Sequence, residues 1–128
     1  MSLTVVRMAR PSREWQESYV RVKKGQRLVV DAEGAWSPDF GNRTGWCGGD
    51  GVPNLIAGDG FLMPGANVGA LVGRVGGGDG KVLALGHRYD NVALDDGVLY
   101  IAMNEREGRI NQAGSLLVTI ILFDADED

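Results

Sequence analysis

The sequence predicts an all-β domain, either a sandwich or a barrel. Its 20 glycines are spread along the chain and separate short apolar and β-branched runs, which is typical of many short strands joined by turns. Apolar residues at helical spacing are almost absent. At 128 residues the chain fits a single domain, residues 1–128, long enough to bury roughly two-thirds of its unfolded surface.

The first predicted strands flank a basic turn. Residues 17–22 and 27–32 are rich in Val and Leu, and Lys23-Lys24-Gly25-Gln26 lies between them. Glycine tolerates the positive φ that such a turn requires. This pattern predicts a β-hairpin.

A long ordered loop is predicted over residues 35–64. This segment contains Pro38, Pro53 and Pro64, many glycines and no long alternating run. Loops of this length are uncommon inside a compact domain and are usually functional. The segment is therefore expected to contribute to a binding site.

Another hairpin is predicted where the chain reads GALVGRV at 69–75, then a glycine cluster at 76–80 and a short apolar run at 81–86. Glycines in the connection would supply positive φ. A phosphate-binding loop is not expected, because Lys81 is followed by Val82 instead of Ser or Thr and no helical pattern follows.

The last two predicted strands, 98–103 and 115–121, flank a polar loop at 104–114. Asp95-Asp96-Gly97 is a turn signal that leads into the first of them. The loop carries Asn, Gln and Glu side chains near both ends. Together with backbone carbonyls, these are the ligands that calcium prefers, and a calcium site is one means of holding vicinal sugar hydroxyls.

Charge and composition exclude several functions. The net charge of −4 and pI near 4.9 argue against a nucleic-acid partner, which requires a basic face. No apolar run approaches the ~18 residues of a membrane span. The single cysteine, Cys47, excludes an intramolecular disulfide and is expected to be a buried or half-buried structural residue. The single histidine, His87, is expected to be structural or exposed, since no nucleophile motif accompanies it.

The N-terminal residues bear on the location that is expected for this protein. Residues 1–4 lack the basic region and apolar core of a signal peptide and are compatible with residues added for expression. We therefore expect the protein to be cytoplasmic, exported without a cleaved signal peptide, or already trimmed. Residues 124–128 are expected to form a solvated acidic tail.

Several segments taken together resemble the bacterial galactophilic lectins of the PA-I type. The matching segments run in order over about residues 17–121, and they are Lys24-Gly25-Gln26, Ala32 to Trp36, Trp46 with Gly48 to Asp50, Gly69 to Val72 with Arg74, Gly97 to Ile101, Asn104-Glu105, Asn111-Gln112 and Gly114-Ser115. The resemblance implies a jelly-roll-like β-sandwich, of galactose-binding-domain type, that binds galactose through calcium and assembles as a homo-oligomer.

The resemblance also implies which residues would hold the metal. The acidic ligand falls on Glu105, the loop carbonyl on Arg109, the amide pair on Asn111 and Gln112, and a distant carbonyl near Asp39. This chain departs from the family pattern, because Glu replaces a shorter Asp, Gln replaces Asn and the loop is one residue shorter. Two arginines in the loop would also repel a divalent cation, so calcium is expected to bind weakly, and an arginine could take its place.

The expected sugar contacts are Asn104, Glu105, Asn111, Gln112 and Asp50. The family's His-Pro-x-x-Gln segment has no counterpart after Asp50, so the partner is a carbohydrate of galactose type or another glycan. Trp36 and Trp46 are each either a stacking face or packing residues. The expected function is a non-catalytic lectin-like domain, and the alternative is a scaffold that has lost sugar binding and serves as a dimeric or tetrameric assembly module.

Overall fold

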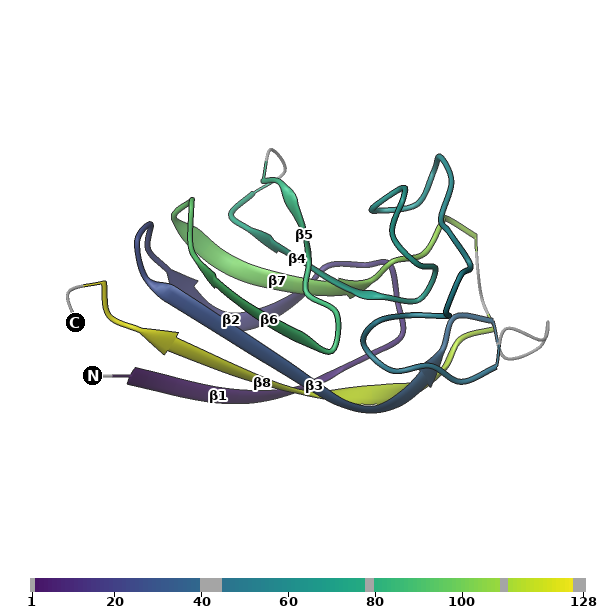
Figure 1. Ribbon diagram of the computed structural model, residues 1–128, viewed down its shortest axis with the longest axis horizontal. Coiled ribbons are helices and arrows are strands. Elements are labelled where there is room, and N and C mark those ends of the chain that lie inside the picture. The colour runs from purple at the N-terminus through teal and green to yellow at the C-terminus, as the bar shows by residue number, and fades with distance from the viewer. Residues whose placement is uncertain (1, 40–44, 78–79, 109–110, 126–128) are drawn as a thin grey trace.

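A computed structural model describes residues 2–39, 45–77, 80–108 and 111–125. They form two four-stranded antiparallel sheets packed face to face (Figure 1). The first sheet has the order β1-β8-β3-β6 and the second β2-β7-β4-β5. The strands are β1 (Ser2–Ala9), β2 (Gln16–Val22), β3 (Arg27–Ser37), β4 (Leu71–Val75), β5 (Val82–Ala84), β6 (Arg88–Val92), β7 (Gly97–Met103) and β8 (Ala113–Phe123). The predicted all-β sandwich is confirmed.

The core lies between the sheets, where apolar side chains from both sheets meet, and β8 shows the underlying alternation of buried and exposed residues clearly. In β8, Leu116, Val118, Ile120 and Leu122 are buried, while the residues between them are more exposed. These side chains pack against apolar residues of the facing sheet, such as Leu99 and Ile101 in β7. The described residues contain no helix with the length and apolar character needed to cross a membrane.

Most connections between the described strands pass from one sheet to the other. The predicted hairpin of 17–22 with 27–32 is wrong, because β2 pairs with β7 whereas β3 pairs with β6 and β8. Gly25 has the expected positive φ of 95°, but its N–H donates to the carbonyl of Ala93, so the turn carries the chain between sheets. The predicted hairpin between 69–75 and 81–86 is confirmed as β4 and β5.

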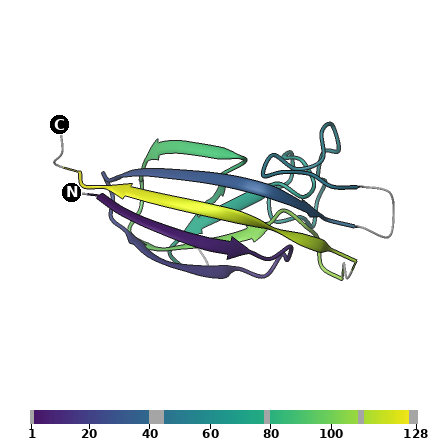
Figure 2. The ribbon, with the colours of Figure 1, turned by 90° about the horizontal axis from the view of Figure 1, so that it is seen from below.

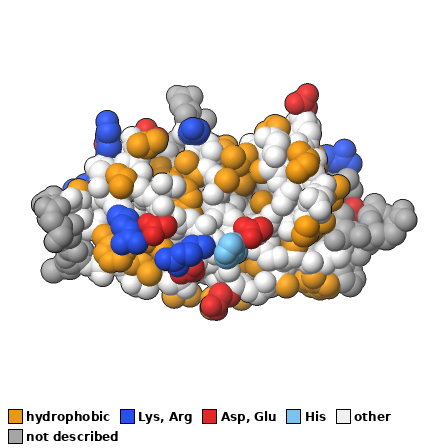
Figure 3. Space-filling view, in the orientation of Figure 1, with side chains coloured by type: hydrophobic (Ala, Val, Ile, Leu, Met, Phe, Trp, Pro, Cys, Tyr) orange, Lys and Arg blue, Asp and Glu red, His pale blue; other side chains and the backbone are white. Residues whose placement is uncertain are grey.

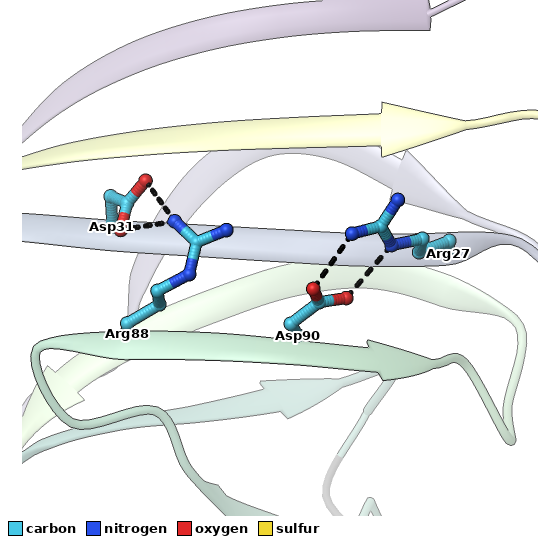
Figure 4. A network of polar contacts seen from close by, with 4 residues as sticks. All are labelled: Arg27, Asp31, Arg88 and Asp90. Atoms are coloured by element: carbon cyan, nitrogen blue, oxygen red, sulfur yellow. Dashed lines mark hydrogen bonds and ion pairs between the residues drawn. The ribbon is translucent and has the colours of Figure 1, made fainter.

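Two strands were not anticipated from the sequence. β1 is an edge strand that pairs along its whole length with residues 116–123 of β8, and its residues are mostly exposed on both faces. β6 includes the polar segment from Arg88, and two ion pairs join it to β3 (Figure 4). Edge strands need only half of their backbone paired and tolerate polar faces, so neither carries a strong alternating signal.

The ion pairs lie on the part of the first sheet that β3 and β6 form. Arg27 donates two hydrogen bonds to Asp90 at 2.8 and 2.7 Å, and Arg88 donates to Asp31. The bond from Arg27 holds the pKa of the Asp90 carboxyl below its usual range. Figure 3 shows basic and acidic side chains alternating across this face of the molecule. Between these pairs lies Val29, which is only 3% exposed, because the stems of charged side chains shield apolar surface.

The long irregular segment from 38 to 70 covers one end of the sandwich, opposite the two chain termini (Figures 1 and 2). Trp36, at 0% exposure, anchors it by donating from Nε1 to the carbonyl of Gly69 at 2.8 Å. The backbones of Trp36 and Cys47 exchange two hydrogen bonds. The predicted loop is therefore confirmed as ordered over its described part.

Asn104 provides the second anchor of this segment. Its side-chain oxygen accepts from the N–H of Met63 at 2.8 Å, and its amide donates to the carbonyls of Met63 and Asn67 at 3.0 Å. The residue is fully buried. Because buried polar groups are costly when unpaired, these bonds stabilise the Asn104 side chain, and they add to the hydrogen bonds that the loop makes within itself at the carbonyls of Met63 and Asn67.

We predict that Asn104→Ala lowers the free energy of unfolding by about 2–4 kcal/mol, because three buried hydrogen bonds are lost and their backbone partners remain. Urea denaturation measures the change. Asn111→Ala is the matched control, since the same truncation at an exposed residue should cost within about 0.5 kcal/mol. Equal effects of the two substitutions would contradict the anchoring role of Asn104.

A second prediction concerns Cys47, which is buried as expected. Burial raises the pKa of its thiol to about 11, and a hydrogen bond involving Trp36 offsets part of the rise. The thiol should therefore react with a disulfide reagent at pH 8 far more slowly in the native protein than in urea. Because the unfolded thiol ionises first, stability should fall as the pH rises from about 9 toward 11. Rapid labelling of the native protein at pH 8 would contradict this environment.

Candidate functional site

The 104–114 loop and the long segment meet at the end of the sandwich. Gly69 donates its N–H to the carbonyl of Asn104 at 2.9 Å, and Asn104 donates to that of Ala70 at 2.8 Å. A single antiparallel bridge joins Phe61 and Arg106. Backbone hydrogen bonds thus place the residues that follow β7 against the middle of the long segment.

A pocket of about 200 Å³ lies between these two segments, and we call it the acid pocket. One wall is apolar and partly aromatic, and the other carries two carboxylates. Its lining residues are Pro38, Asp39, Leu55, Ile56, Phe61, Val68, Glu105 and Arg106. Concave sites with an apolar wall and a few convergent polar groups are typical of small-molecule binding.

The two carboxylates of the acid pocket are deeply placed. Asp39 is 5% exposed and Glu105 is 1% exposed. The Oε1 atom of Glu105 accepts a hydrogen bond from the N–H of Arg106 at 2.9 Å, and its backbone carbonyl accepts one from Nε of Arg13 at 3.2 Å. These contacts fix the residue at both ends.

The other residues expected at the site are distributed differently. The side chain of Asn104 makes hydrogen bonds to the long segment, as described above. Gln112 lines a second pocket, which shares Arg106 with the first. Asn111 is exposed just before β8, and Arg109 lies outside the described residues. Of the expected residues that the structure describes, Asp39 and Glu105 line the acid pocket.

Asp50 lies outside both of these pockets. Its carboxylate accepts the N–H of His87 at 2.9 Å and contacts Nδ1 of the same residue at 2.6 Å. Its carbonyl accepts from Asn67 at 3.0 Å. Asp50 therefore holds the long segment against the start of β6, and His87 is exposed and paired, in agreement with its expected structural or surface role.

The two tryptophans expected near the site differ in exposure. Trp36 is fully buried and packs in the core, which excludes it as a stacking face. Trp46 is 53% exposed and lies so close to Gly114 that a Cβ there would be 2.4 Å from its ring. Trp46 thus packs over the start of β8 while leaving ring surface accessible.

Sequence reasoning missed several residues of the acid pocket. Leu55 and Ile56 are 40% and 61% exposed, and Phe61 completes the apolar wall. The available signal was the pair of large aliphatic residues within a loop otherwise rich in glycine and proline. No local sequence pattern indicates the contact between Arg13 and Glu105, because it spans 92 positions.

The donor set of the described residues does not fit a calcium ion. Calcium takes about 6–8 oxygen ligands, whereas two carboxylates line the acid pocket and a guanidinium-bearing residue, Arg106, lines it with them. Within the described parts of the chain, no group of three or more His, Cys, Asp or Glu residues is arranged to hold a metal. Gln112 belongs to the neighbouring pocket.

Comparison with known proteins identifies a related fold. No protein-family model matches the chain, and no curated protein matches it. A solved structure does match, the N-terminal domain of EclA, which is described as a PllA-like lectin. The two chains share 17% sequence identity over 94% of each, with a TM-score of 0.65. The chain therefore has a PllA-like lectin fold, and the resemblance to PA-I-type lectins is confirmed at the level of the fold.

Proposed function

We propose that this protein is a non-catalytic carbohydrate-binding domain that holds a sugar in the acid pocket without calcium. The observation that supports this most directly is the pairing of two buried carboxylates with an apolar wall at one loop end of a lectin-like sandwich. Asp39 and Glu105 would accept hydrogen bonds from sugar hydroxyls. The apolar face of a pyranose ring would pack on Phe61 and Ile56.

Further contacts would come from the rim of the pocket. Arg106 is exposed and lines the pocket, so its guanidinium would donate to ring or hydroxyl oxygens in the place where a cation would otherwise act. Asn111 and Gln112 follow in the same loop and would extend the contacts. Asn104 and Asp50 would act indirectly, by holding the long segment in position.

A second function is favoured by the outer face of the first sheet. Val6, Met8 and Leu117 are 49%, 61% and 40% exposed, and Met8 lies directly opposite Leu117 in the β1 and β8 pairing. Contiguous exposed apolar side chains often mark an interaction surface. The alternative is therefore a lectin-like scaffold that forms homo-oligomers through this face and binds no sugar.

A glycan array, probed with and without a calcium chelator, separates these functions. We expect glycan binding that the chelator does not reduce. We also expect excess calcium to raise the melting temperature by no more than a few degrees, because a weakly bound ion stabilises little. Chelator-sensitive binding with a large calcium-dependent shift would contradict the metal-free site. Absence of glycan binding together with a stable oligomer in light scattering would favour the scaffold.

Substituting Glu105 tests the acid pocket itself. Glu105→Gln keeps the size of the side chain but removes the charge, and hydrogen bonds to charged groups contribute about 1.5–3 kcal/mol. We expect glycan affinity to fall by about tenfold or more in calorimetric titration. Glu17→Gln, the same change at an exposed residue of β2, is the control and should leave affinity unchanged. Equal affinity of the two variants would remove Glu105 from the site.

A further inference from the structure

A second pocket lies beside the acid pocket, and we call it the arginine pocket. It has a volume of about 310 Å³ and is formed by the segment that joins β1 to β2 and by the loop that follows β7. Its lining residues are Pro11, Ser12, Arg13, Glu14, Arg106, Glu107, Gly108 and Gln112. This volume lies at the lower end of the range for ligand sites, roughly 300–1,000 Å³, and suits a single sugar unit.

The wall formed by the β1 to β2 connection is held in place by hydrogen bonds. Ser12 accepts the N–H of Met103 through its carbonyl at 2.8 Å, and its Oγ accepts that of Glu14 at 3.0 Å. The side-chain amide of Gln16 bonds both the N–H and the carbonyl of Arg10. The wall is therefore organised before any ligand arrives, which reduces the cost of binding.

Arg13 is the residue that gives this pocket its chemistry. It is half-buried, and its Nε donates to the carbonyl of Glu105 at 3.2 Å, which fixes the plane of the guanidinium. Among the described residues the ion pairs join Arg27 to Asp90, His87 to Asp50 and Arg88 to Asp31. Arg13 and Arg106 take part in none of these.

The two acidic residues of the lining contribute less to the electrostatic potential inside the pocket than Arg13 does. Glu14 and Glu107 are both exposed, whereas Arg13 is half-buried. Water screens exposed charges strongly, and a partly buried charge acts through a lower dielectric. A ligand inside the pocket would therefore be influenced more by Arg13 than by the two glutamates.

We propose that the arginine pocket is a subsite for the carboxylate of an acidic sugar. The planar guanidinium fork matches a carboxylate with two parallel hydrogen bonds, and Ser12 and Gln112 supply polar atoms for neighbouring hydroxyls. Because Arg106 lines both pockets, a disaccharide could place its acidic unit here and its neutral unit in the acid pocket. This extension to two units rests on the proposed function above.

Two matched sugars test the proposal on the full chain, namely methyl β-glucuronide and methyl β-glucoside, which differ in one carboxylate. Titration followed by NMR should show the glucuronide binding at least tenfold more tightly than the glucoside. Arg13→Gln should abolish this preference, and Arg13→Lys should keep only part of it. Arg10→Gln is the matched control, because Arg10 is an exposed arginine of the same segment that does not line the pocket, and this variant should keep the full preference.

Arg13 also contacts the backbone of Glu105, so its substitution removes a loop contact together with the charge. A second variant separates these two effects. Arg106 is exposed, and Arg106→Gln should weaken glucuronide binding without lowering the melting temperature. Equal binding of the two sugars, or a preference that survives both substitutions, would overturn the proposal. Binding of neutral glycans that Glu105→Gln abolishes, without a glucuronide preference, would refute this subsite alone. A glucuronide preference that requires Arg13 but is unaffected by Glu105→Gln would support the arginine pocket while refuting the acid pocket.

Discussion

The architecture of the loop end depends on satisfying the backbone of one long irregular segment. Backbone hydrogen bonds within the segment from 38 to 70, such as the one from Val52 to Val68, pair part of its backbone, and Ala57, Val68 and Ala70 are buried. Two polar side chains from outside the segment supply further partners, the indole of Trp36 and the amide of Asn104. Both are fully buried, where an unpaired polar group would be costly. The positions of the apolar wall and of Asp39 in the acid pocket follow from these two anchors.

Much of the fold could be predicted from the sequence, and the errors have physical causes. The segment around β8 carries a clear alternation because one of its faces is buried, and the segment around β7 is strongly apolar because Ile101, Ala102 and Met103 are all buried. β1 and β6 are edge strands with mixed exposure, so their patterns resemble those of loops. The turn at Gly25 looks like a hairpin turn locally. Its partner, the carbonyl of Ala93, is distant in sequence, and only that contact reveals the crossing between sheets.

The candidate site was less predictable because its geometry depends on long-range contacts. Glu105 was anticipated as a site residue and lines the acid pocket with Asp39. Asn104, its neighbour in sequence, looks equally suited to bind a ligand, but alternation along the strand end turns its side chain toward the long segment. Arg13 donates a hydrogen bond to the carbonyl of Glu105, which is 92 positions away in the sequence. No local sequence pattern predicts such a contact. The sequence therefore pointed to the loop that lines both pockets, but it could not show where the individual side chains of that loop lie.

Glu105 links the two pockets through its side chain and its backbone carbonyl. Its carboxylate lines the acid pocket, while its carbonyl accepts the hydrogen bond from Arg13 of the arginine pocket. Arg106 lines both pockets, so an arginine lies beside the two acidic residues of the acid pocket. In the proposed site this arrangement would oppose a divalent cation, and it would suit a ligand with hydroxyls at one end and an anionic group at the other.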